Sequence, residues 1–468
     1  MQKSEKTIFF SIIYLGCMLR LFDFITASAI ELDGIGYAQM AGSFAKGAIF
    51  EGLKGISHPL YPVFLGGFSF FVKDLEIAGR IVSFIFGILL IYFTFLFFKN
   101  FFGEKKALYG AFFVAIHPYL VRYSVQVLSE SMTTCLFAAA VFFFYKGWKE
   151  EDKTSIGLSG VFLALTYLNK AEYIIYALPF CFLLVKEKRF SHICILLACI
   201  ALFAFPYVYY LKLETGLWTI TKKVGVAESL VNNEIVAYTY KYPFESSLQL
   251  LRRLPFVVYN FFEAIFPPLF ILAVLGFKRV EPSYRMLSIV LVVLHIIARV
   301  VFAPHSTKRY SVEFIPVLIV FSIEGMYVLK EFFERYRHKN QLYYAVFAVI
   351  IAASIFQGIT LQNKGRAFHK QAGLFLLETD PGNKIISRLP VVPFYARGEY
   401  INISALKEVK DCSQWAGFTR KTGAKYLVFD DRLVNNLLFQ DGCLTGFKLV
   451  VEFKDKSEFV KIYRLNDG

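Results

Sequence analysis

Long apolar runs separated by short polar segments make up most of this chain. Most of these runs approach the roughly 20 residues that a helix needs to cross a bilayer. They cover residues 7–28, 77–98, 106–122, 129–147, 155–169, 172–186, 190–211, 255–277, 284–303, 310–329 and 341–361. The pattern predicts an α-helical polytopic membrane protein with about eleven spans.

The composition changes after residue 361. Short alternating runs, typical of strands, occur at Lys384–Ser387, Lys425–Phe429 and Phe459–Tyr463, and the segment 404–422 between them has a helical pattern. A segment of about 100 residues is long enough to fold by itself. We therefore predict a membrane domain over residues 1–361 and a small soluble α/β domain over residues 362–468.

Basic residues set the expected orientation of the spans. They gather between the apolar runs at Lys99/Lys105/Lys106, Lys146–Lys153, Lys186–Arg189, Lys278/Arg279 and Lys330–Lys339. Eleven crossings place all these clusters on one side, which the positive-inside rule makes cytoplasmic, together with the N-terminus. Merging the short runs 155–169 and 172–186 into one re-entrant pair would instead put the later clusters outside. Segments 29–76, 212–254 and 362–468 are then extracytoplasmic.

The overall composition supports the membrane class. The chain of 468 residues is 56% hydrophobic, 18% aromatic and only 19% charged, with a mean hydropathy of +0.52. A soluble protein of this size does not need so much apolar surface. The net charge of +15 is accounted for by the topological clusters, so we do not expect nucleic acid as a partner.

The junction between the first apolar run and residues 31–37 carries the first candidate for chemistry. Asp33 leaves a membrane helix beside two glycines, and ionisable residues at this level of a membrane are usually functional. It can act as a general base for an acceptor group, or it can simply cap the helix predicted at 35–46. That helix has its apolar positions at helical spacing, lies on the membrane surface and ends at Gly47.

Glu130 is the second candidate, at the outer end of the run 129–147. Ser129 can cap this helix, and a glutamate in the first turn suits the helix dipole, which is a purely structural explanation. The functional alternative is that Glu130 faces the same extracytoplasmic space as Asp33.

Several cations and their neighbours are predicted to lie at the same depth, near the extracytoplasmic surface of the membrane. A departing phosphate requires fixed positive charge, which Lys or Arg at the membrane surface can supply. The alternative is ordinary interfacial placement of long basic side chains beside tyrosine. This group comprises Lys170, Glu172, His305, Lys308, Arg309 and Tyr310, and we predict binding roles for all of them except Lys308.

The remaining candidates carry weaker signals. His58 and Tyr61 are candidates for hydrogen bonds to a sugar, although a lone histidine before a proline is commonly a structural loop residue. No three-ligand metal constellation and no glycine-rich phosphate loop are visible, so the sequence identifies no metal ligands, leaves the use of a divalent metal open and does not favour a nucleotide cofactor. Cys412 and Cys443 lie in the soluble domain and can pair if it is extracytoplasmic; the sequence leaves open whether they do.

Taken together, these motifs resemble those of the GT-C glycosyltransferases, particularly the protein O-mannosyltransferase and aminoarabinose-transferase-like group. Residues 33–41 with Gly47 and 58–62 resemble the first outer loop of that family. The stretch 117–131 resembles its second acidic motif, 168–172 a Thr-Arg-x-Glu turn, and 309–316 the late Arg-Tyr motif. The motifs occur in the family's order over about the first 330 residues.

The resemblance implies an inverting sugar transfer from a polyprenyl-phosphate donor to an extracytoplasmic protein, lipid or glycan. Asp33 would deprotonate the acceptor, Glu130 would position the acceptor or assist Asp33, and Lys170 and Arg309 would hold the departing phosphate. Three positions depart from the family pattern: Gly34 replaces a second acid, Lys170 an arginine and Glu130 an aspartate. The departures leave the subfamily and the use of a divalent metal open.

Other classes of protein make different predictions. A transporter or flippase of lipid-linked sugars should show paired inverted repeats with broken helices near the midplane. No such repeat is visible, and the candidate charges gather on one side. A ligase or polymerase of lipid-linked glycans should have a large outer loop late in the chain, whereas here the long outer loop is the first. A non-catalytic scaffold would not need carboxylates and cations at the same depth of the membrane.

Overall fold

A computed structural model describes residues 3–222, 247–302, 307–360, 366–403, 415–431, 444, 446–455 and 458–466. The chain forms two compact units. The first contains Met1–Ile25 and Tyr37–Leu361, and the second contains Thr26–Gly36 and Gln362–Gly468. The short linking segment between the first two helices therefore belongs with the C-terminal residues.

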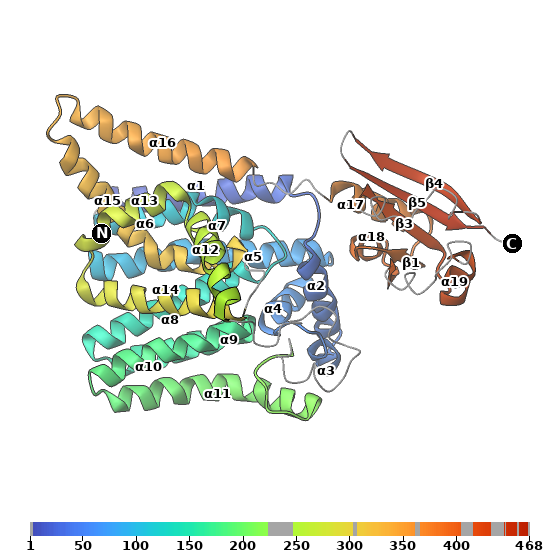
Figure 1. Ribbon diagram of the computed structural model, residues 1–468, viewed down its shortest axis with the longest axis horizontal. Helices are drawn as coiled ribbons and strands as arrows, with labels where there is room; N and C mark the ends of the chain where they lie inside the picture. Colours follow the sequence, from blue (N-terminus) through green and yellow to red (C-terminus); the bar gives the residue numbers. More distant parts are fainter. Residues whose placement is uncertain are drawn as a thin grey trace. The chain divides into compact units, whose positions relative to one another are not determined.

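The regular elements in the described residues of the first unit are all helices (Figure 1). Helices α8, α9 and α11 pack side by side, and α5 packs against both α6 and α8. The longer helices are α1 (Lys3–Thr26), α5 (Leu75–Phe102), α6 (Glu104–Ile116), α8 (Glu130–Glu150), α9 (Lys153–Asn169), α10 (Ala177–Lys186), α11 (Phe190–Thr215), α12 (Ser247–Ala264), α13 (Pro267–Gly276), α14 (Pro282–Phe302), α15 (Ile315–Phe333) and α16 (Lys339–Thr360). Shorter pieces are α7 (Pro118–Tyr123) and the 3₁₀ turns η1 (Ala171–Tyr176), η2 (Phe277–Arg279), η3 (Lys308–Tyr310) and η4 (Val312–Phe314).

The structure confirms the helical membrane class, with fewer clear spans than predicted. Each predicted apolar run is a helix or a pair of helices. Within the described ranges, six helices are long and apolar enough to cross a membrane, or seven if the pair α12–α13, bent by 96°, is one span. Helices α6, α9 and α10 have only 13, 17 and 10 residues. Hydropathy alone does not distinguish such short packed helices from full spans.

Three short helices follow the first span: α2 (Leu32–Ala45), α3 (Ile49–Leu53) and α4 (Leu60–Ser69). Helix α2 ends where predicted, because Gly47 adopts a φ of +75° and its N–H bonds to the Phe44 carbonyl at 3.0 Å. Helix α4 begins at Leu60, and Pro62 lies in its first turn, where a missing N–H costs nothing.

Glycine allows α13 and α15 to pack closely. A Cβ added to Gly325 would collide with the backbone of Leu272, and one added to Gly276 would collide with the Phe321 carbonyl. Each of the two glycines therefore lies where its own helix contacts the other helix.

We expect Gly325→Ala to destabilise the protein by about 1–3 kcal/mol through overpacking. Thermal unfolding in detergent measures this effect. Gly358→Ala is the matched control, because a Cβ at Gly358 in α16 meets nothing within 4 Å. An equal melting temperature for both variants would show that the α13–α15 contact tolerates the methyl group.

The C-terminal unit contains a five-stranded sheet in the order β2-β1-β3-β5-β4. Strand β1 is parallel to β2 and β3, whereas β5 is antiparallel to β3 and β4. The predicted strands correspond to β1 (Lys384–Ser387), β3 (Tyr426–Asp430) and β5 (Phe459–Leu465); β2 (Glu399–Asn402) and β4 (Phe447–Lys454) were not predicted. The helices of this unit are α17 (Ala367–Thr379), α18 (Val391–Tyr395) and α19 (Trp415–Thr422).

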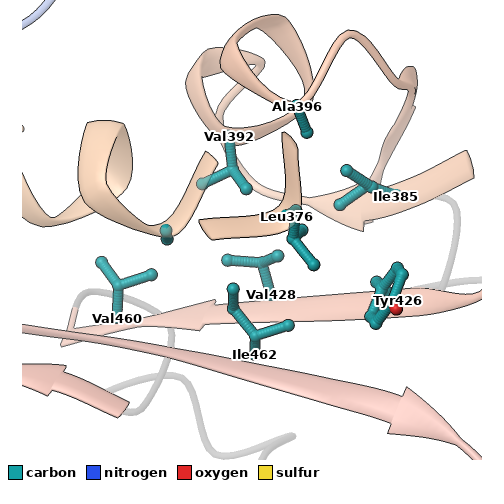
Figure 2. Packing of buried hydrophobic residues seen from close by; sticks show 9 residues of the cluster. Leu376, Ile385, Val392, Ala396, Tyr426, Val428, Val460 and Ile462 are labelled. Carbon is teal, nitrogen blue, oxygen red and sulfur yellow. The ribbon is translucent and has the colours of Figure 1, made fainter. Parts of the chain in front are cut away.

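Both faces of this sheet are covered. Figure 2 shows Leu376 of α17 and Val392 of α18 packed against strand residues that include Ile385 and Val428. The alternate residues of the same strands, Ile386, Leu427 and Phe429, pack with Trp415 of α19 in a second cluster. The alternation of side chains along each strand thus builds two small cores.

Asp430, at the end of β3, is buried and contacts Arg388 and His369. Its carboxylate accepts hydrogen bonds from Arg388 Nε at 2.8 Å and is 3.2 Å from His369 Nε2. Burial alone raises the pKa of Asp430, but the bonds from His369 and Arg388 outweigh it and the net pKa lies below its ordinary 3.8.

The sign of this shift predicts a pH dependence of stability. Because the folded-state pKa is lowered, the ionised Asp430 stabilises the fold above its ordinary pKa and this stabilisation is lost as the pH falls through the folded pKa. Asp430→Asn should therefore lower the unfolding temperature at pH 7, and the difference from the parent should shrink below pH 4 (roughly, from the carboxyl reference value). Limited proteolysis of the whole chain during heating, read at the C-terminal unit, measures the unfolding temperature of the variant and of the parent at each pH. A difference that is constant with pH would contradict this role.

Candidate active site

Glu130 begins α8 and is fully buried. The expected capping role of Ser129 is wrong, because its side chain makes no capping bond. The Ser129 hydroxyl is instead 3.1 Å from the Tyr37 hydroxyl of α2. The start of α8 thereby contacts α2, the helix whose first turn contains Asp33.

Glu130 and a second buried carboxylate enclose Lys170. The Lys170 ammonium is 3.2 Å from Glu130 Oε1 and 3.0 Å from Glu313 Oε1. Arg309 Nε is 2.8 Å from the same Glu130 oxygen. The Lys170 side chain is 8% exposed and both carboxylates are 0% exposed. Because water is largely excluded from these groups, their opposite charges must stabilise one another.

Tyr310 is the aromatic partner of three cations. Its ring centroid is 4.4 Å from Arg299 Cζ, 5.2 Å from Arg309 Cζ and 5.5 Å from Lys170 Nζ. Arg299 also pairs with Glu172 at 3.3 Å. Cations this close to an aromatic face are held by the ring's quadrupole. We call Glu130, Lys170, Glu172, Arg299, Arg309, Tyr310 and Glu313 the ion cluster.

The ion cluster contains three carboxylates and three cations and is formally neutral. Burial by itself lowers the pKa of Lys170, but Glu130, Glu313 and Glu172 raise it by more, and the net pKa lies above its ordinary value. Lys170 therefore stays protonated. Arg309 is the most exposed of the three cations, at 25% of its side chain, and is the one best placed to meet a ligand.

A hydrogen-bonded frame holds the backbone around the ion cluster. Asn169 donates its amide to the Ser129 carbonyl at 3.0 Å and to the Thr133 hydroxyl at 2.8 Å. Across the site, His295 is 2.9 Å from the Tyr176 hydroxyl and 3.1 Å from the Ser311 hydroxyl. These bonds fix the turns that present Lys170 and Tyr310.

His58 and Tyr61 have other surroundings. His58 Nε2 is 3.2 Å from the Ile220 carbonyl, and its ring packs edge-on against Tyr167 and Tyr207. Tyr61 is fully buried and donates its hydroxyl to the Gly79 carbonyl at 2.9 Å. Their roles in binding a substrate stay predictions.

Asp33 lies in the first turn of α2, is exposed and belongs to the C-terminal unit, whereas the ion cluster belongs to the helical unit. A carboxylate in that turn is stabilised by the helix dipole. Its proposed role as a base stays a prediction. His305, Cys412 and Cys443 lie outside the described residues. Among the residues that the structure describes, no group of three His, Cys, Asp or Glu side chains is arranged to hold a metal ion.

Sequence reasoning missed Arg299 and Glu313. Arg299 lies within the apolar run 284–303, and Glu313 lies within the run 310–329. Charges inside membrane segments usually face the protein interior and mark function. This rule applies to both positions.

Comparison with known proteins extends the motif evidence. Residues 57–210 match a family described as dolichyl-phosphate-mannose-protein mannosyltransferase. No curated protein matches the chain significantly by sequence. Among solved structures, ArnT from Cupriavidus metallidurans bound to undecaprenyl phosphate is 12% identical, with a TM-score of 0.62 over 99% of this chain and 98% of that chain.

Two further structures are similar. The oligosaccharyltransferase AglB from Archaeoglobus fulgidus, in complex with an inhibitory peptide and a dolichol-phosphate, is 12% identical, with a TM-score of 0.56 over 100% of this chain and 74% of that chain. The mycobacterial arabinofuranosyltransferase AftD is 13% identical, with a TM-score of 0.50 over 98% of this chain and 41% of that chain. At these identities the likeness establishes a shared fold.

Proposed function

We propose that this chain, which has the fold of the GT-C superfamily of membrane glycosyltransferases, moves one sugar from a polyprenyl-phosphate donor to an extracytoplasmic acceptor. The donor sugar is a hexose or a pentose, and the acceptor is a protein, a lipid or a glycan. The membrane domain, residues 1–361, would be catalytic. The N-terminus would be cytoplasmic and the domain 362–468 extracytoplasmic.

One observation carries this proposal: three cations from different parts of the chain converge on Tyr310. Lys170 follows α9, Arg299 lies in α14, and Arg309 lies in η3. A phosphate that leaves a sugar gains negative charge, and preorganised cations in a partly desolvated site stabilise that charge. Two similar proteins were solved with undecaprenyl phosphate and a dolichol-phosphate, which is the product expected of such a donor.

The proposed step is a single displacement. The acceptor hydroxyl or amine loses its proton to Asp33 and attacks the anomeric carbon. The bond between that carbon and the phosphate oxygen breaks, and the electron pair leaves with the polyprenyl phosphate. Arg309 and Lys170 would receive the phosphate, while Glu130 and Glu313 keep Lys170 in place.

Proteoliposomes with a radiolabelled polyprenyl-phosphate sugar test the proposal against the flippase alternative. A glycosyltransferase removes the label from the polyprenyl lipid and leaves unlabelled polyprenyl phosphate. A flippase moves the intact lipid between leaflets with the label still attached. Movement of the intact lipid without transfer, using each of a panel of hexosyl and pentosyl donors, would refute the proposal.

Arg309→Gln should weaken binding of polyprenyl phosphate by about tenfold or more, because a charge-assisted bond to phosphate is lost. The measurement is a titration of the purified protein with polyprenyl phosphate. Arg279→Gln is the control, since Arg279 forms an exposed ion pair with Glu331 outside the ion cluster. Equal affinities of the two variants for polyprenyl phosphate would show that Arg309 does not bind the phosphate.

A further inference from the structure

The segment that carries Asp33 belongs to the C-terminal unit. Thr26–Gly36 is grouped with residues 362–468, while the rest of α2 is grouped with the helical unit. The helix Leu32–Ala45 therefore begins in one unit and continues into the other without a break. Whatever fixes residues 26–36 also fixes the first turn of this helix.

Two contacts, at residues 30 and 31, attach this segment to the C-terminal domain. The Ile30 N–H donates a hydrogen bond to the Tyr395 hydroxyl at 2.9 Å, and the Ile30 side chain is only 1% exposed. The next residue, Glu31, accepts a hydrogen bond from Arg366 Nη1 at 2.8 Å. These two contacts, which we call the tie, involve residues two or three positions before Asp33.

Arg366 and Tyr395 lie in well-packed parts of the C-terminal domain. Arg366 immediately precedes α17, and Tyr395 ends α18. These helices pack so closely that a Cβ on Gly373 would lie 2.5 Å from the Tyr395 Cβ. Lys370 Nζ lies 5.0 Å from the centroid of the Tyr395 ring. Tyr395 itself is 8% exposed, so its hydroxyl is presented from a fixed side chain.

We propose that the C-terminal domain positions Asp33 for the transfer reaction, and that Arg366 and Tyr395 are the positioning residues. The proposal rests on the function proposed above. The tie acts through Glu31 and the Ile30 backbone N–H. These two groups immediately precede α2, so fixing them also fixes the first turn of that helix, which contains Asp33. A general base works only within hydrogen-bond reach of the proton it takes, so loss of this tie lowers the catalytic rate. A domain that only selects the acceptor would not need to hold this segment.

The test uses the full-length protein and reads both the segment and the reaction. Hydrogen exchange of residues 26–36 reports the tie whether or not the protein is active. Transfer from a radiolabelled polyprenyl-phosphate sugar gives kcat and KM. The variants are Arg366→Glu, Tyr395→Phe and the charge swap Glu31→Arg/Arg366→Glu. Lys384→Glu is the matched control, because Lys384 forms an exposed pair with Glu399 in the same domain.

Arg366→Glu should speed exchange of residues 26–36 by about tenfold and lower kcat by about tenfold with little change in the KM for the donor. Tyr395→Phe should act in the same direction. The charge swap should restore both quantities towards the parent, and Lys384→Glu should change neither.

Exchange and kcat that match the Lys384→Glu control in both Arg366→Glu and Tyr395→Phe would overturn the proposal. So would a fall in kcat without faster exchange of residues 26–36, or a charge swap that restores neither quantity. If the parent itself transfers no sugar, the proposed function fails, and the exchange data still decide whether the domain holds the segment.

Discussion

Asp33→Asn is expected to lower kcat for sugar transfer by about 10³-fold, because general base catalysis contributes about 10²–10⁴-fold. The amide has nearly the shape of the carboxylate but does not take up a proton at neutral pH. Asp33 is exposed in the first turn of α2, so the substitution should not disturb packing. Transfer from a radiolabelled polyprenyl-phosphate sugar by the purified variant measures the loss.

Asp74→Asn is the matched control for this prediction. Asp74 immediately precedes α5, and its carboxylate accepts a hydrogen bond from the Ile77 N–H at 2.9 Å. Asparagine can keep that capping bond, so transfer should be unchanged. If Asp33→Asn transfers sugar as fast as Asp74→Asn, Asp33 is not the base.

Glu130→Gln is expected to destabilise the protein by about 3–5 kcal/mol, the usual cost of removing one partner from a buried ion pair. The glutamine fills the same space but leaves Lys170 and Arg309 without the charge that they share. Lys170 keeps Glu313, so the ion cluster should lose its geometry without losing every partner. Thermal unfolding measures stability, and titration with polyprenyl phosphate measures the effect on binding.

Glu281→Gln provides the comparison for Glu130→Gln. Glu281 pairs with Lys149, and both side chains are more than a third exposed (36% and 42%). Exposed pairs contribute at most about 1 kcal/mol, so this variant should unfold close to the parent. If both glutamine variants unfold alike and bind polyprenyl phosphate alike, the ion cluster does not organise the site.

The class of fold was predictable because hydropathy is read directly from the chain. Apolar runs predicted the helices, and alternation predicted β1 at the residues where it occurs, Lys384–Ser387. The resemblance to the GT-C superfamily is confirmed by the family match over residues 57–210 and by the shared fold. Strand β2 was missed because its four residues carry no alternation strong enough to stand out.

The candidate site was predictable only in part. Glu130, Lys170, Arg309 and Tyr310 were named from the sequence, and the structure brings them together. The pairing of Lys170 with Glu313 joins residues 143 positions apart, which no local pattern reveals. The same holds for the tie between Glu31 and Arg366, 335 positions apart, which attaches the start of α2 to the C-terminal domain.

The anomeric configuration of the transferred sugar tests the central claim most directly. The measurement uses a donor whose sugar–phosphate bond has a known configuration, with the product examined by nuclear magnetic resonance. A single displacement by an acceptor deprotonated at Asp33 predicts the opposite configuration in the product and one polyprenyl phosphate released per sugar transferred. A product that retains the donor's configuration would contradict this account.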